Sequence, residues 1–220
     1  MENKLFVNRL TASPLILKNM VIAIGASTGG TETTLKILRQ LPADMPGIVV
    51  TQHMPEGFTA MYASRLDQLC AMRVKEARDG DVIEQGQVLL APGGECHMSV
   101  VKEGHQYKVR CLHGEKVNGH RPSVDVLFRS VAETVGRSAV GVILTGMGAD
   151  GAAGLLQMRK KGAYTIGQDK ESSIVYGMPM EAQRIGACSI QASCNDIAYL
   201  LVKYINQHHL VGAEDHSNKF

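Results

Sequence analysis

The 220-residue sequence contains no tryptophan, only five cysteines and almost no net charge. The cysteines stand at positions 70, 96, 111, 188 and 194 and form no C-x-x-C pair. An odd number without such spacing argues against a disulfide framework and against structural zinc, so we interpret them as mostly buried thiols. The formal net charge of +2 gives no reason to expect nucleic-acid binding.

Long hydrophobic runs are also missing. No apolar stretch approaches the ~20 residues that a membrane-spanning helix needs. The first twenty residues lack the uninterrupted apolar core of a signal peptide, because Asn8, Arg9 and Thr11 interrupt it. We therefore expect a cytoplasmic protein without membrane insertion.

The most informative segment that is present is a glycine-rich loop at 25–30, with the sequence Gly-Ala-Ser-Thr-Gly-Gly. It follows an apolar run at 21–24, which is typical of a buried strand, and precedes a predicted helix at 31–41. Ser27 therefore lies where a strand turns into a helix, with glycines on both sides. Glycine removes the Cβ clash of a sharp turn, and a helix N-terminus offers free N–H groups to a developing anion, so Ser27 is well placed as a nucleophile.

Three patterns compete for this loop. A dinucleotide-binding loop G-x-G-x-x-G needs glycine where Ser27 stands, and a phosphate loop needs lysine where Thr31 stands. The pattern G-x-S-x-G fits Gly25, Ser27 and Gly29. A glycine-rich turn with a capping serine stays open as the simpler interpretation.

A catalytic serine needs a base and a group that orients the base. His53 follows a predicted strand at 48–52, and Asp150 follows the most apolar short run, at 139–145. Ser27, His53 and Asp150 are thus all expected beyond the carboxyl ends of strands in one open sheet, where such sheets bind ligands. Taken singly, His53 could be a turn residue and Asp150 the cap of the following helix. The order Ser-His-Asp differs from the Ser-Asp-His of α/β-hydrolases.

The rest of the chain alternates predicted strands and helices. Helices are predicted at 58–69, 124–135 with Ser123 as N-cap, 152–161, 180–184 and 195–206, strands at 74–77, 88–91 and 163–167, and an antiparallel hairpin at 97–101 and 106–111. The strand at 163–167 is expected to be the last parallel one. This alternation indicates an α/β fold with a mostly parallel sheet covered on both faces.

Several motifs give the chain a resemblance to a known family. The first three are Gly-Ala-Ser-Thr-Gly-Gly at 25–30, Gln-His-Met-Pro at 52–55 and Leu-Thr-Gly-Met-Gly-Ala-Asp-Gly at 144–151. They are similar to the signature motifs of the chemotaxis protein-glutamate methylesterases, the CheB type. Further matches follow in family order: Ala-Pro-Gly-Gly at 91–94, His97-Met98, Arg-Pro-Ser-Val-Asp-Val-Leu-Phe at 121–128 and Tyr-Gly-Met-Pro at 176–179. This many motifs in the same order as in the family are not expected by chance.

The resemblance implies a three-layer α/β/α sandwich with a mostly parallel sheet and a small antiparallel hairpin. It also implies a serine esterase that hydrolyses glutamate γ-methyl esters on the cytoplasmic helices of chemoreceptors to glutamate and methanol, with receptor glutamines open to the same acyl-transfer chemistry. Ser27, His53 and Asp150 match the catalytic motifs. Backbone N–H groups near Thr28 and Met147 are the candidate oxyanion donors. No metal or organic cofactor is expected.

The chain also departs from the family pattern. Ala149 stands where asparagine commonly precedes the aspartate, although the aspartate itself is present. Met180 stands where arginine often follows Gly-Met-Pro, and we expect this change to alter a contact with the acidic receptor surface, and so substrate affinity, rather than the chemistry. Arg65, His120 and Arg121 are candidates to meet an acidic receptor surface, with plain solvated charge as the alternative.

We expect an N-terminal segment at 1–19, the catalytic domain at 20–210 and a polar tail at 211–220. The receiver domain that usually precedes this catalytic domain needs roughly 120 residues, so we expect it to be absent from this chain. Control by a separate regulatory partner and constitutive activity both stay open. The alternative function is a catalytically silent receptor- or partner-binding module of the same fold, against which Ser27, His53 and Asp150 together argue.

Overall fold

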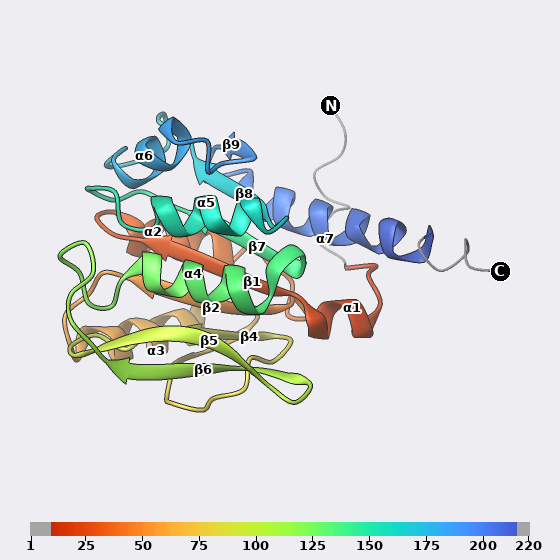
Figure 1. The fold of residues 1–220 in the computed structure, drawn as a ribbon, viewed down its shortest axis with the longest axis horizontal. Helices are drawn as coiled ribbons and strands as arrows, with labels where there is room; N and C mark the ends of the chain where they lie inside the picture. The colour runs from red at the N-terminus through yellow and green to blue at the C-terminus, as the bar shows by residue number, and fades with distance from the viewer. Residues whose placement is uncertain (1–9, 215–220) are drawn as a thin grey trace.

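The computed structural model describes residues 10–214, with side chains up to residue 207, and its centre is a seven-stranded parallel sheet (Figure 1). The strand order is β3-β4-β2-β1-β7-β8-β9. The strands are β1 (Val21–Ala26), β2 (Gly47–Gln52), β3 (Arg73–Glu76), β4 (Gln87–Leu90), β7 (Ala139–Ile143), β8 (Tyr164–Gln168) and β9 (Ile190–Ala192). A separate antiparallel hairpin consists of β5 (Cys96–Glu103) and β6 (Gln106–His113).

Helices cover both faces of the sheet and give a three-layer α/β/α arrangement (Figure 1). They are α1 (Pro14–Asn19), α2 (Gly30–Leu38), α3 (Phe58–Leu69), α4 (Val124–Thr134), the 3-10 turn η2 (Gly136–Ser138), α5 (Ala152–Lys160), α6 (Met178–Arg184) and α7 (Ile197–Glu214). One buried cluster joins α1, α2, α3 and α7 to sheet residues such as Ile24 and Val50. The other joins α4, α5, α6 and the hairpin to Ala23 and Val49. Between residues 10 and 214, no helix combines the length and hydrophobicity needed to cross a bilayer.

The central strands bring three loops to one edge of the sheet. β1 and β2 are buried along their whole length, as expected for parallel strands covered on both faces. They pair in register up to Ala26 opposite Gln52, and β7 flanks β1 on the other side. Because β1 has β2 on one side and β7 on the other, the loops after these strands meet where α/β sheets place their ligands. This edge lies at the left of Figure 1.

The predicted fold class is confirmed, including the three layers, the mostly parallel sheet and the small hairpin. The helix predicted at 58–69 coincides with α3. The expectation that the strand at 163–167 is the last parallel one is wrong, because β9 pairs in parallel with β8 outside it. β9 has only three residues, too few for an alternation pattern to be recognised. The helix predicted at 195–206 is α7 and continues to Glu214, whereas the proposed domain boundaries stay predictions.

All five cysteines are free thiols. Cys188 and Cys194 are buried, but Cys70, Cys96 and Cys111 are partly exposed, so the interpretation of mostly buried thiols is wrong for three of them. Burial raises the pKa of Cys111 to about 12 and that of Cys188 to about 11. These two thiols are therefore protonated at neutral pH, and a protonated thiol is a poor nucleophile.

A side chain at position 25 is predicted to lower the free energy of unfolding, because β1 and α4 pack against each other there without space for it. A methyl group on Gly25 would overlap Val124 Cγ1 and lie 3.1 Å from Phe128 Cζ. Gly25→Ala should cost about 2–3 kcal/mol of the free energy of unfolding, as overpacking of a filled core does. Denaturant titration measures this cost. The double variant Gly25→Ala/Val124→Ala should recover part of it, and strictly additive losses would contradict the steric explanation.

Candidate active site

Ser27 lies at the carboxyl end of β1, held from both neighbouring strands. Its N–H donates to the carbonyl of Thr145 at 3.0 Å. Its own carbonyl accepts from Gly30 N at 2.8 Å and from Gln52 Nε2 at 2.9 Å. Gly29 has a φ of 78°, in the left-handed region that favours glycine, and from there the chain enters α2. The G-x-S-x-G pattern therefore occupies the predicted strand–turn–helix, with Ser27 at the turn.

His53 follows β2 directly and lies beside the Ser27 loop. Its backbone N–H donates to the carbonyl of Ala26 at 3.0 Å. Its side chain is 8% exposed, and its Nε2 lies 2.8 Å from Asp150 Oδ2. An ionised carboxylate only accepts hydrogen bonds, so Nε2 carries the proton and Nδ1 keeps its lone pair. Nδ1 is buried without a hydrogen-bond partner among the described residues. The nitrogen available as a base is therefore Nδ1.

Asp150 is 1% exposed, and donors surround both of its carboxylate oxygens. The donors are His53 Nε2 at 2.8 Å and Val124 N at 2.7 Å to Oδ2, and Ser123 Oγ at 2.7 Å, Asn118 Nδ2 at 2.9 Å and Asp125 N at 3.2 Å to Oδ1. The two backbone donors belong to the first turn of α4. Asp150 therefore interacts with the N-terminus of α4 rather than capping α5, the helix that follows it, and still contacts His53.

The hydrogen bonds to Asp150 determine its ionisation. Burial alone would raise the pKa of this carboxyl. The hydrogen bonds from His53, Asn118, Ser123 and Val124 outweigh burial and hold the pKa well below its usual range. Asp150 is therefore ionised at neutral pH and can stabilise a positive charge on the imidazole.

A two-residue turn supplies further contacts to this pair. Asn118 and Gly119 have φ values of 53° and 79°, and the residues on either side exchange two backbone hydrogen bonds, as in a type I′ turn. The Asn118 side chain reaches Asp150. The ring of His120 stacks on that of His53, with centroids 3.8 Å apart and planes at 9°. The turn thus packs against both members of the His53–Asp150 pair.

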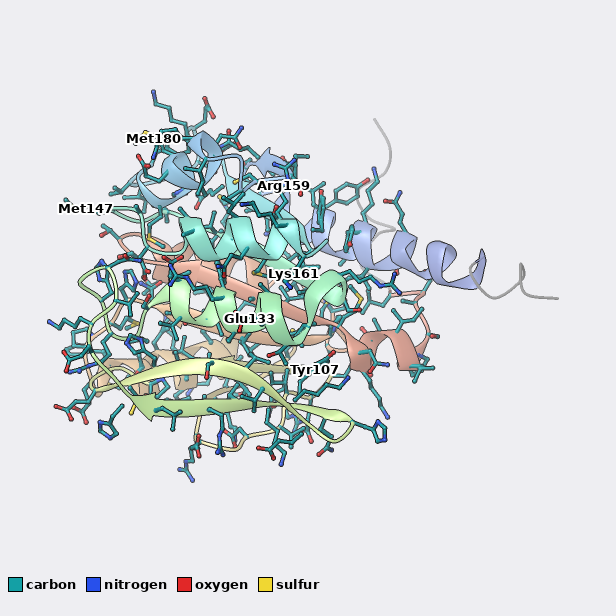
Figure 2. All side chains as sticks on the ribbon, in the orientation of Figure 1. Tyr107, Glu133, Met147, Arg159, Lys161 and Met180 are labelled. Atoms are coloured by element: carbon teal, nitrogen blue, oxygen red, sulfur yellow. The ribbon has the colours of Figure 1, made fainter. Side chains whose placement is uncertain are left out.

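The predicted oxyanion donors, Thr28 and Met147, belong to the loops that follow β1 and β7. The N–H groups of Ser27 and Gly146 already donate to backbone carbonyls, so they are not available to a ligand. A Cβ on Gly146 would lie 2.7 Å from Ser27 Cβ, which shows that the two loops are in contact. Met147 is 73% exposed at the edge where the strands end (Figure 2). The roles of Thr28 and Met147 as donors stay predictions.

The structure brings Ser27, His53 and Asp150 to the same edge of the sheet, with direct contact between the last two. Their catalytic roles stay a proposal. Asn118, which donates a hydrogen bond to the Asp150 carboxylate, was not predicted from the sequence. Ser123 was predicted only as the N-cap of α4, whereas its hydroxyl donates to Asp150 and makes no capping hydrogen bond. An Asn-Gly pair is a strong signal for a type I′ turn, and that signal could have located Asn118.

The lowered pKa of Asp150 predicts how stability depends on pH. Below about pH 4 the unfolded chain takes up a proton at this carboxyl while the folded chain does not, so the free energy of unfolding should fall as the pH decreases. Asp150→Asn removes this contribution, and the fall between about pH 4 and pH 2 should become shallower. Urea titrations at several pH values measure the slope. Asp44→Asn, at an exposed position, is the control, and equal slopes in Asp150→Asn and wild type would contradict the prediction.

The protein is a three-layer α/β/α sandwich with a serine, a histidine and an aspartate at the carboxyl edge of its parallel sheet. It therefore belongs to the class of α/β proteins whose functional site lies at that edge. Within this class, the sequence profile named CheB methylesterase matches residues 22–201. The protein belongs to the CheB methylesterase family.

Comparison with individual proteins agrees. The chain is 56% identical over 187 residues to a protein-glutamate methylesterase/protein-glutamine glutaminase 2 of Syntrophomonas wolfei, covering 85% of this chain and 54% of the relative. It is 52% identical over 189 residues to a similarly named protein of Sulfurimonas denitrificans, covering 86% and 53%. The crystal structure of the Thermotoga maritima CheB methylesterase catalytic domain superimposes with a TM-score of 0.82 at 35% identity, covering 84% of this chain and 98% of that one. The chain thus spans about half the length of the curated relatives it matches.

Proposed function

We propose that this chain is a serine esterase that hydrolyses glutamate γ-methyl esters on the cytoplasmic helices of chemoreceptors, releasing methanol and free glutamate. The contact of 2.8 Å between His53 and a fully hydrogen-bonded Asp150, beside the Ser27 turn, is the observation that carries the proposal. Family membership supports the same activity.

In the proposed mechanism, Ser27 attacks the ester carbonyl while Nδ1 of His53 accepts the hydroxyl proton. Asp150 holds the ring through Nε2–H and stabilises the imidazolium that forms. The imidazolium then donates its proton to the leaving methoxide, which departs as methanol. A water molecule, activated by the same nitrogen, hydrolyses the acyl-enzyme to glutamate and regenerates Ser27.

Backbone donors near Thr28 and Met147 would stabilise the negative oxygen of the tetrahedral intermediate. One such donor is typically worth about 3 kcal/mol of the activation barrier. Replacing the methoxide by ammonia as leaving group converts the reaction into deamidation of a receptor glutamine. The same residues would serve that reaction, because both reactions pass through a glutamyl ester of Ser27.

Methanol release from methyl-labelled receptor membranes tests the proposal with the purified chain. We expect release well above the rate without protein. A chain with native circular dichroism that releases no methanol would contradict the esterase and favour the silent binding module.

A further inference from the structure

A pocket of about 240 Å³ opens beside the His53 ring, outside the Ser27 loop. Its lining residues are His53, Met54, Pro55, Lys116, Gly119, His120, Arg121 and Pro122. A pocket of this size is smaller than the ~300–1,000 Å³ of typical sites for whole small molecules, so it suits a single side-chain group. Its position next to the proposed base means that its occupant would be a neighbour of the reacting ester.

The side chains that line this pocket carry a net positive charge. Lys116 and Arg121 line it, and no aspartate or glutamate does. Within the described part of the chain, neither cation has a carboxylate within 4.0 Å. Arg65, by contrast, has a carboxylate partner, Glu32, at 3.2 Å. Of the three residues considered for an acidic receptor surface, Arg65 is therefore the one with an internal partner.

Arg121 is held in a fixed orientation by neutral partners. Its Nε donates to the carbonyl of Gly94 at 2.9 Å and its Nη1 to that of Gly114 at 2.8 Å. Nη2 has no hydrogen-bond partner among the residues that the structure describes. These bonds fix the plane of the guanidinium without neutralising its charge, so an anion could bind with little loss of side-chain entropy.

His120 adds a hydrogen-bonding group to the pocket rather than a charge. Burial lowers the pKa of His120, and the neighbouring His53 and Lys116 add to this effect against the opposing influence of Asp150. At neutral pH the positive charge therefore comes from Lys116 and Arg121. The buried carboxylate of Asp150 offsets only part of this charge, because it opposes the effects of His53 and Lys116 on His120 but is one negative charge against two cations.

We propose that this pocket, which we call the Lys116–Arg121 subsite, binds a carboxylate side chain that the protein substrate carries close to its ester-bearing glutamate. The proposal rests on the proposed esterase function and adds a substrate preference to it: methyl esters with an acidic neighbour are preferred over those with neutral neighbours. A planar guanidinium and a flexible ammonium are suitable partners for a carboxylate. The subsite would align the substrate segment before Ser27 attacks.

The test uses two versions of a cytoplasmic receptor fragment, each methylated at one glutamate. One version keeps the acidic residues within one helical turn of the ester, and the other has alanine in their place. For the wild-type chain, kcat/KM for methanol release should be about fivefold higher on the acidic version, mainly through KM, as for a partly exposed ion pair. This advantage should shrink as the ionic strength rises.

Lys116→Glu should abolish or invert the preference, and Lys116→Gln should reduce it. The matched control is Lys161→Glu, an exposed lysine that follows α5 at the end opposite to Met147 (Figure 2). The control should keep the wild-type preference. Equal rates of the wild-type chain on the two fragments, or an equal loss on both in Lys116→Glu, would overturn the subsite. Absence of Ser27-dependent methanol release from either fragment would instead overturn the esterase function on which the subsite depends.

Discussion

Ser27→Ala is expected to reduce methanol release from methylated receptors by ~10⁴- to 10⁶-fold, which is the range for loss of a catalytic triad member. The loss should appear in kcat, because the serine hydroxyl forms a bond only during the reaction. Stability should hardly change, since the hydrogen bonds that hold this residue use its backbone N–H and carbonyl.

The matched control is Ser64→Ala, which changes an exposed serine on α3. It should leave both turnover and thermal unfolding at wild-type values. A folded Ser27→Ala protein with more than about a tenth of the wild-type turnover would exclude Ser27 as the nucleophile. Its place at a glycine-rich turn would then be purely structural.

Asp150→Asn is expected to lower kcat by ~10⁴-fold while KM changes little, as when the orienting aspartate of a triad is replaced. An asparagine side chain is neutral, so it cannot stabilise the imidazolium of His53 as the Asp150 carboxylate does. Its NH₂ group would also face hydrogen-bond donors that need an acceptor. The loss should therefore persist across the whole pH range of activity. The pH profile of kcat at saturating substrate measures this.

A stability effect accompanies this substitution and must be separated from the catalytic one. Ser123→Ala removes one donor from Oδ1 and leaves the contact between His53 and Oδ2 intact. It should therefore destabilise the protein while costing far less activity than Asp150→Asn. Equal losses of kcat in the two variants would mean that the carboxylate acts mainly by holding the loop, not by orienting the imidazole.

The sequence was sufficient to predict the sheet edge but not the contacts around Asp150. Apolar runs ending in Ser27, His53 and Asp150 locate the edge, because parallel strands bring their carboxyl ends together. The contacts of Asn118 and His120 depend on where a turn distant in sequence packs, and a pattern of hydrophobic residues contains no such information. β9 was missed for a different reason, since it is short and at the edge of the sheet.

The contact between Asp150 and the first turn of α4 makes two backbone amides sensitive to the position of this carboxylate. The backbone N–H groups of Val124 and Asp125 both donate to this carboxylate. A local opening that separates the Asp150 carboxylate from the first turn of α4 exposes these two amides to solvent. Their rates of hydrogen–deuterium exchange, read by NMR, therefore follow the integrity of the His53–Asp150 pair without a substrate. Amides deeper in α4 would exchange only when the helix itself opens.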